Sequence, residues 1–178
     1  MRKTEIRFGG SGGQGVVFAA LVLGRAAVLD GKNVLQTQAY GAEARGSLTK
    51  SEVIISEDKI GFPAVRKSDI LVTMSQEATN ELLKDLRETG TLLVDSTSVR
   101  EVPPTNAKVV RFPATETAKR TFGDGLYANM IMLGALLHTS RLVRAESVEE
   151  AISASTAKKY AETNLNAFRE GLRPQPIQ

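Results

Sequence analysis

The chain has 178 residues, one histidine, no cysteine and a mild net charge of +3. The lack of cysteine excludes disulfides, thiol catalysis, cysteine-ligated zinc and an iron–sulfur cluster held by this chain. Few aromatic residues and scattered basic ones argue against nucleic-acid binding, and no apolar run reaches the about 20 residues that span a bilayer. The amino terminus runs directly into a predicted strand rather than a signal peptide, so we expect one cytoplasmic domain over residues 1–178 without a membrane partner.

A glycine-rich stretch, residues 8–16, lies between a predicted strand at 4–7 and a predicted buried helix that ends at residue 29. Glycine permits positive φ and leaves backbone amides bare, here at the positive end of the helix dipole. This layout predicts a binding site for phosphate or another anion. Its candidate residues are Gly10, Ser11, Gly12, Gly13, Gln14 and Gly15.

The spacing of Gly10, Gly12 and Gly15 also fits the dinucleotide-binding pattern G-x-G-x-x-G. However, the second predicted strand, residues 33–37, ends in neutral side chains where a ribose-binding acid is expected. Two valines follow the last glycine in place of the lysine and hydroxyl residue of a P-loop, which excludes Walker chemistry. A tight strand-to-helix turn that binds nothing is the remaining alternative.

A second candidate segment, residues 38–47, follows the end of the second predicted strand, at the edge where open α/β sheets bind ligands. It contains Tyr40, Glu43, Arg45 and Gly46. Arg45 could make a bidentate contact with an anionic group. An exposed loop with an incidental Glu–Arg pair is the alternative interpretation.

The rest of the chain alternates between strand-like and helix-like segments. Strands are predicted at 48–56, 69–74, 91–94 and 108–112, and helices at 75–88, 115–121, 127–140, 146–154 and 157–171. Gly31 is placed to cap the first helix, and Gly90 to end the helix at 75–88. This order predicts an α/β, Rossmann-like three-layer domain with a mainly parallel sheet and helices on both faces.

Three isolated polar residues have structural interpretations. Asp95 follows a predicted strand and is expected to accept hydrogen bonds from loop amides. Asn129 lies on an apolar helix, where an amide needs partners, and is expected to be structural. His138 is expected at a helix end or in the core, because a zinc site needs further ligands.

Four segments in this order, residues 10–16, 40–46, 128–134 and 166–171, give the chain a resemblance to a known family. The sequence resembles the gamma subunit, or gamma domain, of 2-oxoacid:ferredoxin oxidoreductases over nearly its whole length. One departure is Ser47, where the family often continues with a second glycine.

The resemblance implies an assembly in which other subunits hold the cofactors. Thiamine diphosphate and magnesium would lie between alpha and beta subunits, and iron–sulfur clusters in others such as a ferredoxin-like delta subunit. A 2-oxoacid would be decarboxylated, electrons would pass to ferredoxin, and the acyl group to coenzyme A. Asn129 follows the Gly123–Asp124–Gly125 run too closely for a thiamine-binding motif. This chain would therefore hold no cofactor or metal and supply no catalytic residue, and contacts between two copies are compatible with this role.

The expected role is that the glycine turn and the segment at 40–46 share one rim, face the thiamine-binding subunits and help shape the coenzyme A entrance. The isolated chain would be inactive. The expected substrate is 2-oxoglutarate, because separate small gamma subunits are common in that group. Two alternatives are a stand-alone dinucleotide- or flavin-binding oxidoreductase and a purely structural subunit.

Overall fold

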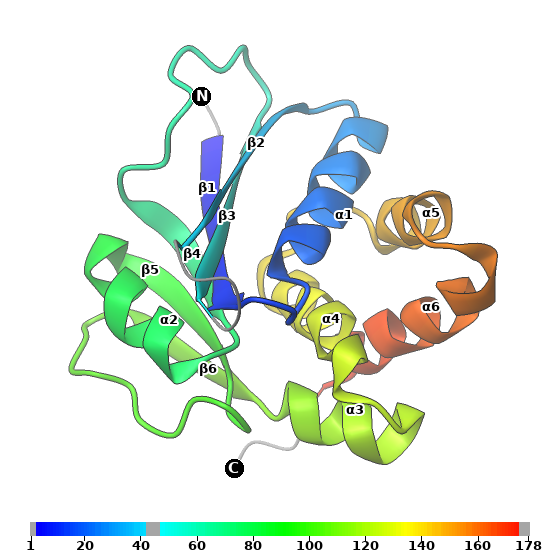
Figure 1. The fold of residues 1–178 in the computed structure, drawn as a ribbon. Helices are drawn as coiled ribbons and strands as arrows, with labels where there is room; N and C mark the ends of the chain where they lie inside the picture. Colours follow the sequence, from blue (N-terminus) through cyan, green and yellow to red (C-terminus); the bar gives the residue numbers. More distant parts are fainter. Residues whose placement is uncertain (1–2, 42–46, 175–178) are drawn as a thin grey trace.

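A single sheet of six strands runs through the computed structural model, which describes residues 3–41 and 47–174 (Figure 1). The strand order is β2-β3-β1-β4-β5-β6. The strands are β1 (Lys3–Ser11), β2 (Asn33–Tyr40), β3 (Leu48–Ser56), β4 (Ser68–Thr73), β5 (Leu86–Asp95) and β6 (Lys108–Phe112).

The sheet is mixed but mostly parallel, because β1, β4, β5 and β6 pair in parallel while β3 is antiparallel to both β1 and β2. A parallel connection needs a crossover of about a dozen residues or more. Residues 41–47 are too few for that, so β2 turns back into β3 as a hairpin. The predicted α/β class with a mainly parallel sheet is confirmed at this level.

Helices cover both faces of the sheet. They are α1 (Val16–Leu29), α2 (Gln76–Leu82), α3 (Ala114–Phe122), α4 (Ala128–Ser140), α5 (Ala145–Ser155) and α6 (Lys158–Leu172). Short 3₁₀ turns, Leu83–Asp85 and Gly125–Tyr127, follow α2 and precede α4. Figure 1 shows α2 on one face and α1 with α4 on the other, where α5 and α6 pack outside them. Within the described residues, no helix is long and apolar enough to cross a membrane.

Strand β4 shows why the sheet needs both layers. Its Ile70 and Val72 point into the large core formed with α1, α4 and their neighbours, whereas Leu71 joins Ala78 and Leu82 of α2 on the opposite face. Successive side chains of a strand alternate between faces, so a continuous apolar run is buried only if both faces are covered. The central position predicted for this strand is confirmed.

Two glycines let α4 and α6 approach each other closely. A Cβ atom added to Gly134 of α4 would lie 2.2 Å from the carbonyl oxygen of Phe168 in α6. A Cβ atom on Gly171 of α6 would meet the carbonyl oxygen of Ile131 at an equally impossible distance. The backbones therefore touch at a crossing that an added side chain would have to push apart.

Two glycines predicted to lie outside strands, Gly10 in the turn and Gly90 at the end of a helix, lie inside strands instead. Strand β1 extends to Ser11, so Gly10 is part of the strand and the turn begins after it. The helix predicted at 75–88 ends at Leu82, and Gly90 lies within β5. The pairing of β4 with β5 shifts near Gly90, where an added Cβ would lie 2.8 Å from the carbonyl oxygen of Asp69. Close backbone approach, rather than a helix stop, requires this glycine.

Two charged residues of β1, Glu5 and Arg7, are buried rather than solvent-facing. Arg7 is 2% exposed and lies directly opposite Glu52 of β3, whose Oε1 accepts a hydrogen bond from the Arg7 Nε at 2.8 Å. Its Nη2 also donates to the carbonyl oxygen of Val65 at 2.8 Å. Removing Glu52 would leave the buried Arg7 with Asp85, 3.1 Å from its Nη1, as the remaining carboxylate partner, and the pair of Arg7 with Glu52 also holds β3 in register with β1.

Candidate functional site at the carboxyl edge of the sheet

The glycine turn connects β1 to α1 at the edge where β1, β2, β4, β5 and β6 all end. Gly13 has φ of 94° and Gly15 has φ of 75°, so both adopt conformations that favour glycine. Gly15 is the N-cap residue of α1, and its position has no side-chain cap hydrogen bond. The first amides of α1 are therefore uncapped by side chains in the described structure, at the positive end of the helix dipole.

Gln14 fastens the turn to the neighbouring strand. The Ser11 amide donates to Gln14 Oε1 at 2.7 Å, and Gln14 Nε2 donates to the carbonyl oxygen of Met74 at 2.7 Å. The Gln14 amide itself donates to the Ser11 carbonyl at 3.1 Å. Gln14 thus links the end of β1 to the residue that follows β4, and its side-chain amide is occupied by this chain.

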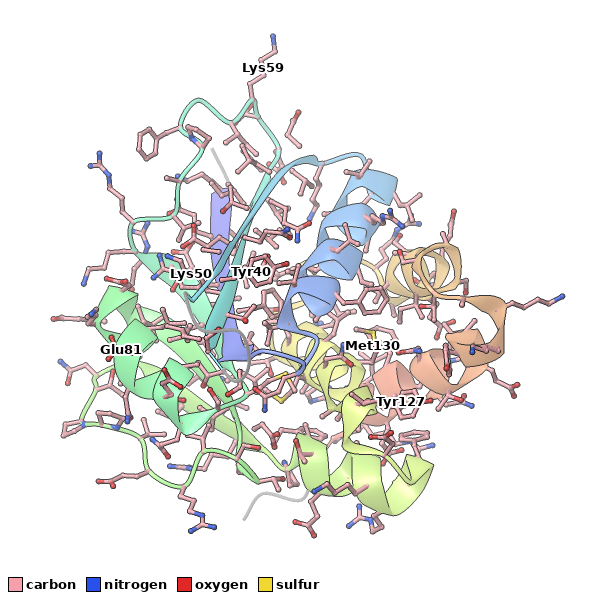
Figure 2. The ribbon with its side chains drawn as sticks, viewed as in Figure 1. Tyr40, Lys50, Lys59, Glu81, Tyr127 and Met130 are labelled. Atoms are coloured by element: carbon pink, nitrogen blue, oxygen red, sulfur yellow. The ribbon has the colours of Figure 1, made fainter. Side chains whose placement is uncertain are left out.

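The second candidate segment begins and ends beside the glycine turn. The amide of Gly12 donates to the carbonyl oxygen of Ser47 at 3.0 Å, and the amide of Gly41 donates to Leu48 at 2.8 Å. Tyr40, the last residue of β2, is 63% exposed and lies at the same edge (Figure 2). The flanks of this segment therefore share one rim with the turn. The predicted site residues Glu43, Arg45 and Gly46 lie outside the described residues.

The turn faces outward rather than into the molecule. Gly12 and Gly13 are exposed, whereas Gln14 and Gly15 are half-buried. Among the described residues, the amides of Gly12 and Gln14 already have acceptors, and those of Gly13 and Gly15 have none. Within the described residues, the chain itself thus occupies the amides of Gly12 and Gln14 but not those of Gly13 and Gly15.

Asn129 hydrogen-bonds to the glycine turn from the buried side. Its Nδ2 donates to the carbonyl oxygen of Gly15 at 3.2 Å, and the Asn129 side chain is almost fully buried. A Cβ atom on Gly15 would lie 2.3 Å from this nitrogen. Gly15 is therefore required by both its backbone conformation and this contact. The structural role predicted for Asn129 is confirmed, and its partner is the glycine turn.

Asp95 lies on the same rim, but its carboxylate accepts hydrogen bonds from other residues of this chain. It is fully buried and accepts hydrogen bonds from the amides of Thr97 and Thr115, both at 3.2 Å, and from the Ser98 hydroxyl at 3.3 Å. These contacts join the loop after β5 to the start of α3. The prediction that Asp95 satisfies loop amides is confirmed.

Titratable groups with shifted pKa values lie away from this rim. Burial alone would raise the pKa of Asp30, but hydrogen bonds from the Ser147 hydroxyl and from Arg144 lower it further than burial raises it. His138 is exposed in the last turn of α4, which confirms its predicted place at a helix end. Within the part of the chain that the structure describes, no three His, Cys, Asp or Glu residues gather as metal ligands. Anion binding at the rim stays a prediction, and we assign no proton transfer to it.

Comparison with known proteins identifies the family. The family model described as pyruvate ferredoxin/flavodoxin oxidoreductase matches residues 5–173. The 2-oxoglutarate synthase subunit KorC of Methanocaldococcus jannaschii is 45% identical over 174 residues, which cover 96% of this chain and 92% of that protein. The common gamma subunit of the pyruvate/ketoisovalerate oxidoreductases of Pyrococcus abyssi is 32% identical over 181 residues, with 97% of both chains covered.

A solved structure agrees with this match. The gamma subunit of a keto/oxoacid ferredoxin oxidoreductase from Geobacter sulfurreducens superposes with a TM-score of 0.84 at 40% identity, over 94% of this chain and 95% of that one. The resemblance of the four sequence segments is therefore confirmed over the whole fold. The chain belongs to the pyruvate ferredoxin/flavodoxin oxidoreductase family, and within it to the gamma-type chains.

Proposed function

We propose that this chain is the gamma subunit of a 2-oxoglutarate:ferredoxin oxidoreductase complex. The complex would decarboxylate 2-oxoglutarate oxidatively, pass electrons to ferredoxin and transfer the acyl group to coenzyme A. The observation that carries this proposal is the 45% identity to a 2-oxoglutarate synthase subunit over nearly the full length of both chains. The gamma subunit that serves pyruvate and ketoisovalerate oxidoreductases is less similar, at 32%.

In this proposal the cofactors of the complex are held by other subunits. A chain without cysteine cannot hold an iron–sulfur cluster through thiolates, and its described residues contain no cluster of three metal-ligating side chains. Alpha and beta subunits would bind thiamine diphosphate and magnesium, and a ferredoxin-like delta subunit would carry clusters. In this proposal the assembly works in the cytoplasm, and its gamma subunit is one Rossmann-like domain. The role of this chain would be to contact the other subunits and coenzyme A through its rim.

The glycine turn is the proposed contact with the thiamine-binding subunits and with the coenzyme A entrance. Three features support it: the exposure of Gly12 and Gly13, the uncapped amino end of the 14-residue helix α1, and the adjacent flanks of the segment that carries Arg45. A phosphate of coenzyme A or a carboxylate of a partner subunit would accept from the amides of Gly13 and Gly15. The helix dipole favours negative charge there by about 0.3–1 kcal/mol, and by up to about 2 when the site is partly buried.

A pair of substitutions at Gly13 tests this role. A Cβ atom at position 13 would meet nothing within 4 Å, but the backbone φ of 94° there strains any residue with a side chain. Gly13→Asp and Gly13→Asn should therefore have nearly the same backbone cost. They differ in one negative charge. In the assembled complex, we expect Gly13→Asp to raise the KM for coenzyme A roughly tenfold above that of Gly13→Asn, which corresponds to about 1.4 kcal/mol.

The same pair of variants separates the alternatives. Equal KM values for coenzyme A together with equal assembly would contradict anion binding at the turn. Weaker assembly of the Gly13→Asp complex with an unchanged KM would show that the anion is a partner carboxylate. Arg45→Ala is a companion test with Arg66→Ala as its control, because Arg66 precedes β4 at the opposite edge of the sheet. A lower affinity for coenzyme A or weaker assembly is expected only for Arg45→Ala.

A further inference from the structure

The two outermost strands of the sheet, β2 and β6, differ in length and in charge. β2 and β6 are the outermost strands of the sheet (Figure 1), and each pairs on one side only within the described residues. Strand β6 is five residues long and carries Lys108 and Arg111. Strand β2 is eight residues long, and its sequence NVLQTQAY has neither a charge nor a proline. Its register with β3 runs from Asn33 to Tyr40 without a bulge.

Natural edge strands are protected from pairing with other chains. They are short, or they carry charges, prolines or bulges that prevent another strand from adding to the sheet. Strand β6 uses the first two of these devices, and β2 uses none of them. An unprotected edge of this length is a template for another strand.

The ladder between β2 and β3 identifies which backbone groups point outward. The amide of Gly41 donates to the carbonyl oxygen of Leu48, which marks this pair as a hydrogen-bonded one. Hydrogen-bonded and non-hydrogen-bonded pairs alternate along an antiparallel ladder. The odd-numbered residues of β2 therefore bond to β3, and the even-numbered residues direct their N–H and C=O groups to the free edge. In the described part of the chain, β2 pairs with β3 alone.

We propose that β2 pairs antiparallel with β2 of a second copy of this chain, about a two-fold axis at Thr37. In this register Val34 lies opposite Tyr40 of the other copy, and Gln36 lies opposite Gln38. All four outward-facing residues of each strand then find partners, with two backbone hydrogen bonds for each pair, or about eight in all. The two sheets become one continuous sheet of twelve strands, twice the six of one copy.

The side chains of β2 complement themselves in this register. A β-branched residue meets an aromatic one where Val34 faces Tyr40, Thr37 faces Thr37, and two amides face each other. Aromatic–β-branched and Thr–Thr pairs stabilise antiparallel strands, whereas like charges opposite each other destabilise them. No charged pair arises, because β2 has no charge. This self-complementarity indicates a second copy, rather than a different strand, as the occupant.

The surroundings of the edge leave room for this contact. Residues 37–40 are all exposed, although successive side chains point to opposite faces of the sheet. A groove of about 530 Å³ lies between α1, α5 and the β2 residues Val34 and Gln36, and Val28 on its wall is 59% exposed. A second copy seated on the edge would cover apolar surface that the described residues of one copy leave in water.

A proline at position 38 tests the pairing. Because the Gln38 amide points outward, Gln38→Pro removes a donor from the free edge and leaves the ladder with β3 intact. We expect sedimentation equilibrium of the full chain at micromolar concentration to give twice the monomer mass. Gln38→Pro should weaken this association roughly tenfold or more, and the control Gln38→Ala should not. Unchanged thermal unfolding at high dilution verifies that the variants fold.

A cysteine on the proposed axis provides a second measurement. The chain has no cysteine, so Thr37→Cys introduces a single thiol. Facing residues of a non-hydrogen-bonded antiparallel pair have Cα atoms about 4.5 Å apart, within the range that a disulfide spans. Mild oxidation should therefore link two Thr37→Cys chains. The control Val109→Cys, exposed on the edge strand β6, should remain unlinked.

Three results would overturn the proposal. The first is a monomeric chain, the second is a dimer that Gln38→Pro leaves unchanged, and the third is equal crosslinking of the two cysteine variants. A monomeric chain whose assembly with other subunits is lost in Gln38→Pro would assign the edge to a foreign strand, which also overturns self-pairing. None of these measurements involves coenzyme A or 2-oxoglutarate, so they stand apart from the proposed function.

Discussion

The contact between Gly15 and Asn129 allows a quantitative test of how the glycine turn is held. An alanine at position 15 must adopt φ of 75°, which costs an L-residue about 1 kcal/mol. Its Cβ would also lie 2.3 Å from Asn129 Nδ2 and 3.0 Å from Cγ. Asn129 is only 5% exposed, so its amide can move away from the added Cβ only by losing the hydrogen bond to Gly15 and straining the core. This displacement should cost about 2 kcal/mol in addition to the backbone cost. We expect Gly15→Ala to lower the free energy of unfolding by about 3 kcal/mol.

Gly31 supplies the matched control. It also has φ of 75°, but a Cβ atom there would meet nothing within 4 Å. Gly31→Ala should therefore cost only the backbone term of about 1 kcal/mol. In an Asn129→Ala background the obstacle to a Cβ at position 15 is gone, so Gly15→Ala should cost about the same as Gly31→Ala. The double-mutant cycle should then give a coupling energy of about 2 kcal/mol.

Urea denaturation of the wild-type chain, both single variants and the double variant measures this coupling. For a domain of this size, about 1 kcal/mol shifts Tm by roughly 2–4 °C, so Gly15→Ala should melt roughly 9 °C below the wild type. Two results would refute the reasoning. One is a coupling energy below about 0.5 kcal/mol, within the range of independent sites. The other is a Gly31→Ala penalty as large as that of Gly15→Ala.

Two further predictions concern the helical layer. Gly134→Ala should destabilise the chain by about 2 kcal/mol, because the added Cβ meets a backbone carbonyl across the α4–α6 crossing. The control Gly24→Ala, whose Cβ meets only a side-chain carbon at 3.4 Å, should stabilise the chain by up to about 1 kcal/mol. Thermal melts measure both effects. Arg169 hydrogen-bonds Glu149 through two nitrogens, at 2.7 and 2.8 Å, and lowers the pKa of this carboxyl below its ordinary value of 4.5. The stabilisation of the fold by this ion pair is therefore complete above pH 4.5 and is lost as the pH falls through the lowered pKa of Glu149. The difference in unfolding free energy between wild type and Arg169→Met should shrink over this acidic pH range and stay constant near neutrality. A difference that persists in acid would assign the effect to packing instead of charge.

Local signals in the sequence located most elements correctly. Strand β6 has the predicted bounds, and the apolar run that became β4 is buried on both faces as its composition predicts. Gly31 takes the left-handed conformation expected at the end of α1. The roles of Asp95 and Asn129 were also predicted, because a buried acid or amide must find partners. Only the identity of those partners required the structure.

The errors share one cause. Gly10 was expected in the turn after the first strand and Gly90 at the end of a helix, yet both lie in strands. Strand pairing, such as that of Gly10 with Thr49, depends on residues far away in the sequence, which local patterns do not contain. The same holds for the antiparallel direction of β3, since nothing in residues 48–56 shows which strand they will pair with. Sequence patterns likewise could not show that Ser47 accepts a hydrogen bond from Gly12.

The amino-acid sequence by itself determined the family, the α/β class and the uncapped glycine turn, because these depend on residue types at short spacings. Only the tertiary structure decided which amides of the turn have acceptors within the described residues, why a side chain at Gly15 would collide with Asn129, and that β2 is an unprotected edge. Each of these depends on contacts between segments separated by many residues, where backbone proximity and strand order decide the outcome. Side-chain chemistry is local, whereas the surfaces that chains present to one another arise only when the fold brings distant residues together.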